Sequence, residues 1–243
     1  FTFKNGAWTF LWKAKDQAGA VVDSPIAGGW AGPSIHDLDN DGIPEIVREG
    51  QVFNSLGTLL SSFPAGYGSY SSGLFPVLAN MDDDPEVEMT NGQFIWQWKA
   101  GAWEQEAYFP GAPPSAPGHV ALADFGAFGQ GPASRPELAV VRSDYAMVYA
   151  LTGELAMQPI LVPGGGGGPP TIADFDGDGL PELAVAGKAY YTIFDIDCTD
   201  TPRPGGECLL GTCDFGACPP GIAWSKSTQD LSSNITGSSV FDF

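Results

Sequence analysis

The chain has 243 residues, of which 43% are hydrophobic and only 16% are charged, so it can form a packed core and does not belong to the disordered class. Its net charge of −19 argues against binding to nucleic acid and against adhesion to anionic lipid. No apolar run approaches the roughly 20 residues that span a bilayer, and no signal peptide is visible, as expected for a cytosolic, a processed or a partial chain.

Many short β-strands are predicted. The 33 glycines and 21 prolines follow no collagen period, so they indicate breaks between short elements. Runs rich in β-branched and aromatic residues lie between these breaks, and helical periodicity is hard to find. The clearest runs are EIVREG (45–50), ELAVV (137–141), MVYAL (147–151), ELAVAG (182–187) and YYTIFDI (190–196).

Four segments repeat one pattern at intervals of about 45 residues. Each has an apolar run, a leading Asp or Asn, a polar loop and a closing Glu before another apolar run. We expect one domain, 1–243, cut within repeat units at both ends and belonging to a longer or cleaved chain. It would hold a partial unit over 1–28, full units over 29–72, 73–115, 116–163 and 164–235, and the start of another over 236–243.

The pattern Asp-x-Asp-x-Asp-Gly-x-x-Glu occurs at 37–45 and again at 174–182. With the repeats, it resembles the FG-GAP and VCBS-type repeats of integrin α-chain propellers and bacterial surface proteins. The resemblance implies an all-β fold, a β-propeller of four-stranded blades with calcium-binding loops between strands. Such propellers commonly have about seven blades, so we expect an incomplete ring here.

The two acidic loops concentrate negative charge that a divalent cation would neutralise. Two like charges about 4 Å apart repel by roughly 4 kcal/mol at an effective dielectric constant near 20. Calcium accepts six to eight oxygen ligands with loose geometry. The resemblance implies the side chains of Asp37, Asp39, Asp41 and Glu45 with the Ile43 carbonyl as one ligand set, and Asp174, Asp176, Asp178 and Glu182 with the Leu180 carbonyl as another. A solvated Asp-Gly turn is the alternative. An EF-hand does not fit, because the twelfth loop positions are Arg48 and Val185.

The other two loops depart from the pattern. The second unit offers Asn80, Asp82 and Asp84, with either Glu86 or Glu88 as the last carboxylate, so a third calcium site stays open. The third unit keeps Asp124 and Glu137 but has Gly126 and Phe128 in the middle, and we expect no metal there. Asp242 would open a further site at the end of the chain.

The last unit contains a cysteine-rich insertion over 198–220. Two local disulfides among Cys198, Cys208, Cys213 and Cys218 would suit an exported protein, with three possible pairings. A Cys₄ zinc site is the alternative, but no Cys-x-x-Cys pair is present. Asn234–Thr236 forms a glycosylation acceptor sequence. The stretch PGGGGGPP (163–170) is interpreted as a flexible connection.

The spacing of the aromatic residues indicates two roles for them. Trp12, Trp98 and Trp224 recur at matching places within the repeat units, which favours packing within blades. Trp30, Trp103 and the YGSY stretch (67–70) are less regular and are candidates for an exposed binding face.

These observations favour an extracellular calcium-binding repeat module that binds a protein or carbohydrate, with structural calcium and no catalytic residues. It would bind no nucleic acid and would not insert into a membrane. One alternative is a polysaccharide lyase or hydrolase, although the two histidines and ten Lys and Arg form no visible cluster beside carboxylates. The other is a structural repeat of a large surface assembly or fibre.

Overall fold

The computed structural model describes residues 2–22, 32–48, 50–62, 64, 76–108, 117–126, 128, 135–228 and 237–238. This part of the chain is all-β, with four four-stranded antiparallel sheets, one two-stranded hairpin and a 3₁₀ turn η1 (Ile196–Cys198). None of the sheets closes on itself. Among the described residues there is no helix with the length and apolarity to cross a membrane.

Each four-stranded sheet is a meander whose strands follow one another in chain order. The hairpin β1 (Thr2–Lys4) and β2 (Ala7–Thr9) precedes them. The first sheet contains β3 (Ser34–His36), β4 (Glu45–Arg48), β5 (Gln51–Phe53) and β6 (Leu59–Ser61), and the second contains β7 (Val77–Ala79), β8 (Glu88–Thr90), β9 (Phe94–Lys99) and β10 (Ala102–Tyr108). The third sheet contains β11 (His119–Ala123), β12 (Glu137–Arg142), β13 (Tyr145–Tyr149) and β14 (Leu155–Leu161). The fourth contains β15 (Thr171–Ala173), β16 (Glu182–Ala186), β17 (Tyr190–Phe194) and β18 (Ile222–Ser227). Every sheet falls within one of the four repeat units expected from the sequence.

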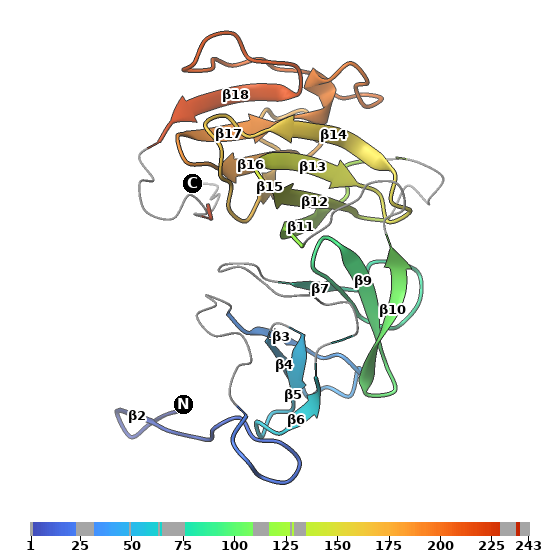
Figure 1. Ribbon diagram of the computed structural model, residues 1–243, viewed down its shortest axis with the longest axis vertical. Helices are drawn as coiled ribbons and strands as arrows, with labels where there is room; N and C mark the ends of the chain where they lie inside the picture. Colours follow the sequence, from blue (N-terminus) through green and yellow to red (C-terminus); the bar gives the residue numbers. More distant parts are fainter. Residues whose placement is uncertain are drawn as a thin grey trace.

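The first sheet lies in the lower part of the view, the second above it, and the third and fourth overlap in the upper part (Figure 1). The first strands lie beside one another, with β7 against β11 and β11 against β15. Neighbouring sheets share hydrophobic cores: Val141 and Val148 of the third sheet pack in one cluster with Leu183 and Val185 of the fourth. Middle strands are therefore buried on both faces, which explains why their sequences are apolar without alternation.

A β-bulge recurs at the same register in all four sheets. In the second sheet, Trp96 pairs with Gln105 and Ile95 with Ala107, so Glu106 has no partner across the strands. In each of the other sheets, one residue of the fourth strand is likewise left without a partner on the third strand. The gap lies level with the two residues that follow the closing Glu on the second strand. These bulged residues are Leu60, Ala156 and Ala223. A bulge bends its strand and redirects the side chain of the extra residue.

Two expectations about tryptophan are wrong. Trp98 lies in the third strand of its sheet and Trp224 in the fourth strand of another, so they do not occupy equivalent places. Trp103 is 8% exposed, and its Nε1 donates to the Gly50 carbonyl at 3.0 Å, so it packs inside rather than presenting a binding face. Trp30, the stretch 67–70, Asn234–Thr236 and Asp242 lie outside the described residues.

The glycine-rich connection is held in place, which differs from the flexible connection expected. The amide of Gly166 donates to Asp144 Oδ1 at 2.6 Å, and the amide of Lys188 donates to the Gly165 carbonyl at 2.8 Å. Asp144 lies in the β12–β13 turn and Lys188 in the β16–β17 turn. The connection therefore bridges the third and fourth sheets.

Candidate metal centre

In all four sheets, the loop that carries the repeated pattern joins the first strand to the second and ends in a buried glutamate. Glu45, Glu88, Glu137 and Glu182 are 6%, 0%, 4% and 1% exposed. Each accepts, through Oε2, the amide of the residue after the leading Asp or Asn: these amides belong to Leu38, Met81, Phe125 and Phe175. Because Glu137 makes this bond in a loop without middle aspartates, the bond belongs to the fold itself. The glutamates therefore close their loops by a hydrogen bond. The sequence analysis, which treated them only as metal ligands, did not predict this structural role.

Burial disfavours the charged form of these glutamates. It raises the pKa of Glu88, Glu137 and Glu182 to about 7, and the accepted amide hydrogen bond acts in the opposite direction. Burial raises the pKa of Glu45 in the same sense. Nearby carboxylates add to the effect wherever the loop is acidic. Each acidic loop is therefore a place where positive charge would be strongly favoured.

The first loop gathers three carboxylates. Asp37 accepts the amides of Asp41 and Gly42 at 3.1 and 2.9 Å, and Asp41 accepts that of Ile43 at 2.7 Å. Gly42 has a φ of 86°, a conformation that glycine adopts readily. One oxygen each of Asp37, Asp39 and Asp41 lies within 4.8 Å of the others. Calcium–oxygen distances of about 2.3–2.6 Å allow one ion to bind all three.

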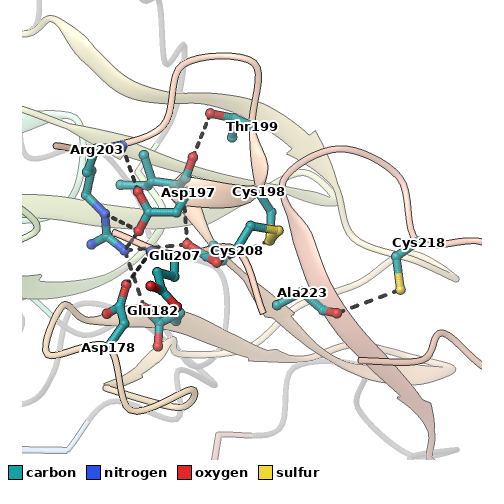
Figure 2. The surroundings of a disulfide bond; sticks show 12 residues. Asp178, Glu182, Asp197, Cys198, Thr199, Arg203, Glu207, Cys208, Cys218 and Ala223 are labelled. Carbon is teal, nitrogen blue, oxygen red and sulfur yellow. Dashed lines mark hydrogen bonds and ion pairs between the residues drawn. A yellow bond between two sulfur atoms is a disulfide. The ribbon is translucent and has the colours of Figure 1, made fainter. Parts of the chain in front are cut away.

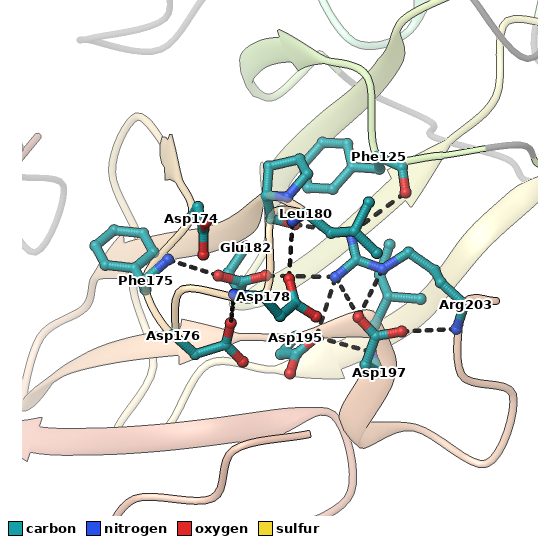
Figure 3. A network of polar contacts seen from close by, with 12 residues as sticks. Phe125, Asp174, Phe175, Asp176, Asp178, Leu180, Glu182, Asp195, Asp197 and Arg203 are labelled. Carbon is teal, nitrogen blue, oxygen red and sulfur yellow. Dashed lines mark hydrogen bonds and ion pairs between the residues drawn. The ribbon is translucent and has the colours of Figure 1, made fainter. Parts of the chain in front are cut away.

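The loop of the fourth unit has a similar backbone but gathers a different set (Figure 3). Asp174 accepts the amides of Gly177 and Gly179 at 2.6 and 3.0 Å. Asp174, Asp176 and Glu182 bring oxygens within 4.8 Å of one another. Asp176 Oδ2 is a buried atom with no hydrogen-bond partner among the described residues, so it is an acceptor available to a cation. Asp178 instead accepts the amide of Glu207 at 2.8 Å.

Arg203, which the sequence did not single out, lies to one side of this loop, and its guanidinium group points toward the loop's carboxylates (Figure 3). Its side chain pairs with Asp197, with Glu182 Oε1 at 3.3 Å and with Asp195 Oδ1 at 3.4 Å. Its Nη1 donates to the carbonyls of Pro181 and Phe125 at 2.9 and 3.3 Å. Arg203 therefore ties the cysteine-rich insertion to the acidic loop and to the neighbouring unit. A lone arginine between two prolines gave no signal of this in the sequence.

Two local disulfides are confirmed, and they pair Cys198 with Cys208 and Cys213 with Cys218. A Cys₄ zinc site is excluded in this state because none of the four thiols is free. The first disulfide lies beside the polar network of Arg203 and next to Glu207, the residue whose amide contacts Asp178 (Figure 2). The insertion is thus cross-linked close to where it touches the acidic loop.

In the second loop, the glutamate that makes the closing hydrogen bond is Glu88 and not Glu86. Glu88 begins β8 and makes the closing hydrogen bond, whereas the amide of Glu86 donates to Asp84 Oδ1 at 3.0 Å, as Ile43 and Leu180 do in their loops. Asn80 donates to the Asp84 carbonyl at 2.7 Å. Asp82 and Asp84 are joined within 4.8 Å by Glu106 of β10, which the sequence reading did not identify. The sequence gives one sign that this loop differs, which is the asparagine at its leading position.

The third loop differs from the other three. Asp124 accepts the amide of Gly126 at 3.0 Å, and Glu137 accepts that of Phe125. Within the described part of this loop, 124–126, 128 and 135–137, no group of three carboxylates comes together. That this loop binds no metal stays a prediction.

No protein-family model matches the chain, and no curated protein does. Among solved structures, it is similar to the crystal structure of the V. cholerae biofilm matrix protein Bap1, with 18% sequence identity and a TM-score of 0.44. The match covers 74% of this chain and 31% of that one, so the chain spans about a third of that protein's length.

Proposed function

We propose that the chain is a segment of an extracellular β-propeller whose acidic loops bind calcium as a structural ion and whose loops bind a protein or carbohydrate. The observation that carries the proposal is the matched pair of loops at 37–45 and 174–182. Each gathers three carboxylate oxygens within 4.8 Å, and the second contains an acceptor, Asp176 Oδ2, that is buried without a partner. A calcium ion would supply the missing charge and hold each loop against its sheet.

The arrangement of the sheets supports a propeller. All four have the same strand order, and the first strands β7, β11 and β15 lie next to one another, as innermost strands do around a propeller axis. Two disulfides in a short insertion support an oxidising, extracellular setting. A cavity of about 540 Å³ beside the first acidic loop, lined among others by Asp39, Trp98 and Lys99, offers a partner a recess with both polar and apolar walls between two sheets.

Calcium-dependent stability and binding together test this proposal. The matched variant is Asp39→Asn with Asp176→Asn, which keeps an oxygen for each loop amide but removes the charge. The exposed Asp200→Asn is the control. We expect calcium to raise the free energy of unfolding of the wild type, by about 2.7 kcal/mol per site at 100 times the dissociation constant. The double variant loses the part of this gain that comes from the loops at 37–45 and 174–182, and the control keeps it.

A glycan and protein binding array, read with calcium and with chelator, tests the second half of the proposal. We expect the wild type to bind a ligand in calcium and to lose it in chelator without product formation. A free energy of unfolding that does not respond to calcium would overturn the proposed calcium binding. Turnover of a bound polysaccharide would favour the enzyme alternative.

A further inference from the structure

The second sheet carries an acidic residue where the other three do not. Glu106 is the extra residue of the bulge in β10, and the equivalent residues are Leu60, Ala156 and Ala223. In the second unit this position lies over the loop that joins β7 to β8, since a Glu106 oxygen is within 4.8 Å of oxygens of Asp82 and Asp84. The bulge directs the Glu106 side chain of β10 toward the β7–β8 loop, which lies about 20 residues earlier in the sequence.

Glu106 compensates for a carboxylate that the loop has lost. The leading residue is Asp37 in the first unit and Asp174 in the fourth, but Asn80 in the second. Pro85 explains the asparagine, because it replaces Gly42 and Gly179, whose amides donate to the leading aspartates. With Glu106, the second unit regains the four carboxylates of the other acidic units: Asp82, Asp84, Glu88 and Glu106.

An independent observation points to a ligand at this place. Glu88 is completely buried, and while its Oε2 accepts the Met81 amide, its Oε1 has no hydrogen-bond partner among the described residues. Glu88 lines a cavity of about 160 Å³ together with Asp82, Glu106 and Arg135. An unpaired buried carboxylate oxygen is costly, so it calls for a cation.

Arg135 lines the same cavity, and its Nε is buried without a hydrogen-bond partner among the described residues. Arg135 donates through Nη2 to Asp83 Oδ2 at 2.8 Å, and Asp83 is the outward-facing aspartate of the loop. This pair is partly exposed, and the charge of Arg135 also acts on Asp82 and Glu106. Asp82, Glu88 and Glu106 line the cavity and Asp84 lies next to them, and in the described part of the chain none of the four forms an ion pair with a basic side chain.

We propose that Asp82, Asp84, Glu88 and Glu106 form a third site for a hard divalent cation, completed by the bulge of β10. The carboxylate-only donor set favours calcium over softer metals. The inference rests on the proposed function for the choice of calcium, whereas the donor set stands on the second unit alone. Asp82 and Asp84 contribute from the loop, Glu88 from the start of β8 and Glu106 from the outer strand.

Ion counting by native mass spectrometry and isothermal titration with Ca²⁺ tests the site. Glu106→Gln keeps the shape of the side chain and removes its charge, and Glu104→Gln, exposed on the same strand, is the matched control. We expect Glu106→Gln to bind one ion fewer than the wild type, or to bind it about tenfold or more weakly, as expected for loss of a ligand. Glu104→Gln binds as the wild type does, and thermal unfolding without calcium shows that both variants fold. Titration of Glu106→Gln that matches the wild type overturns the proposal.

The double variant Asp39→Asn with Asp176→Asn separates this site from the two loops of the proposed function. We expect it to retain one ion that is lost when Glu106→Gln is added. If the first two sites bind calcium and no ion remains in the double variant, the third site is wrong while the proposed function stands. Anomalous diffraction from Mn²⁺-soaked wild-type crystals gives a readout free of substitutions: a peak among Asp82, Asp84 and Glu106 supports the site, and a peak only at the other loops overturns it.

Discussion

Glu137 occupies the closing position of a loop whose middle aspartates are absent. It is 4% exposed and accepts the Phe125 amide at 2.8 Å, as the glutamates of the acidic loops do with their own amides. The hydrogen bond therefore does not depend on an ion. Closing the loop requires only a side chain that reaches back across the strand end and accepts one hydrogen bond.

Burial of Glu137 makes stability depend on pH. Its pKa is raised from 4.5 to about 7, chiefly by burial, so the folded protein keeps a proton that the unfolded chain releases above pH 4.5. Stability from this group is fully present below pH 4.5 and decreases as pH rises to about 7. We expect Glu137→Gln to remove this decrease, which is on the order of 1–3 kcal/mol. Urea unfolding of both proteins from pH 4.5 to 8 measures it, and parallel curves would show that Glu137 is not the cause.

Arg203 is a buried cation whose charge is shared by several carboxylates. It is 4% exposed and contacts Asp197, Asp195 and Glu182. Burial raises the pKa of Asp195 to about 6, and Arg203 acts in the opposite direction. Removing one partner of such a network leaves buried charge without compensation, which costs more than the network contributes when intact.

We expect Arg203→Met to lower the free energy of unfolding by about 3–5 kcal/mol, because it leaves Asp195 and Asp197 buried and unpaired. Lys226→Met is the control, since Lys226 and Asp214 form an exposed pair with side chains 49% and 37% accessible. Chemical denaturation of both variants decides the matter. A loss in Arg203→Met no larger than in the control would mean that the insertion is not anchored by this side chain.

At the scale of elements, the spacing of residues in the sequence is sufficient to predict which side chains come together when all of them lie within one turn. The aspartates of 37–45, and Asp174 with Asp176, are of this kind, because the loop alone brings them together. The spacing of the cysteines predicted two local disulfides but left their pairing open. Glu106 and Arg203 could not be found in this way. Their positions depend on the register of a bulged hairpin and on the path of a cross-linked insertion, and neither is encoded in nearby residues. The tryptophan alignment failed for the same reason, since similar strings fell in different strands.

The glycine-rich connection is an element in which close packing requires glycine. Gly167 has a φ of 141°, and a Cβ there would lie 2.6 Å from Val141 Cγ1, a buried side chain of β12. We expect Gly167→Ala to lower the free energy of unfolding by about 2 kcal/mol or more, from strain and overpacking together.

Gly101→Ala separates the two causes, because Gly101 has a φ of 81° with open space around it. It should cost only the strain of the left-handed conformation, about 1 kcal/mol. Thermal unfolding of the two variants compares them. Equal losses would mean that the contact with Val141 relaxes freely and that the connection is not closely packed.

At the scale of the whole molecule, the described sheets form a row in which each contacts the next. Core clusters join the first sheet to the second, the second to the third, and the third to the fourth. The acidic loops lie between the first and second strands of their own sheets, so each ion would stabilise one unit directly and its neighbours through the shared cores. The third sheet, whose described loop gathers no acidic group of three, would depend on its neighbours alone.

Hydrogen exchange with and without calcium would show this uneven distribution along the chain. We expect slower exchange over 37–45, 80–88 and 174–182, because opening each loop then requires release of its ion. At 100 times the dissociation constant, the slowing reaches about 100-fold where opening releases one ion. The third loop, 124–126 and 135–137, should exchange at the same rate in both conditions. Slower exchange in the third loop equal to that of the others would mean that calcium acts on the molecule as a whole, and the assignment of ions to individual loops would be wrong.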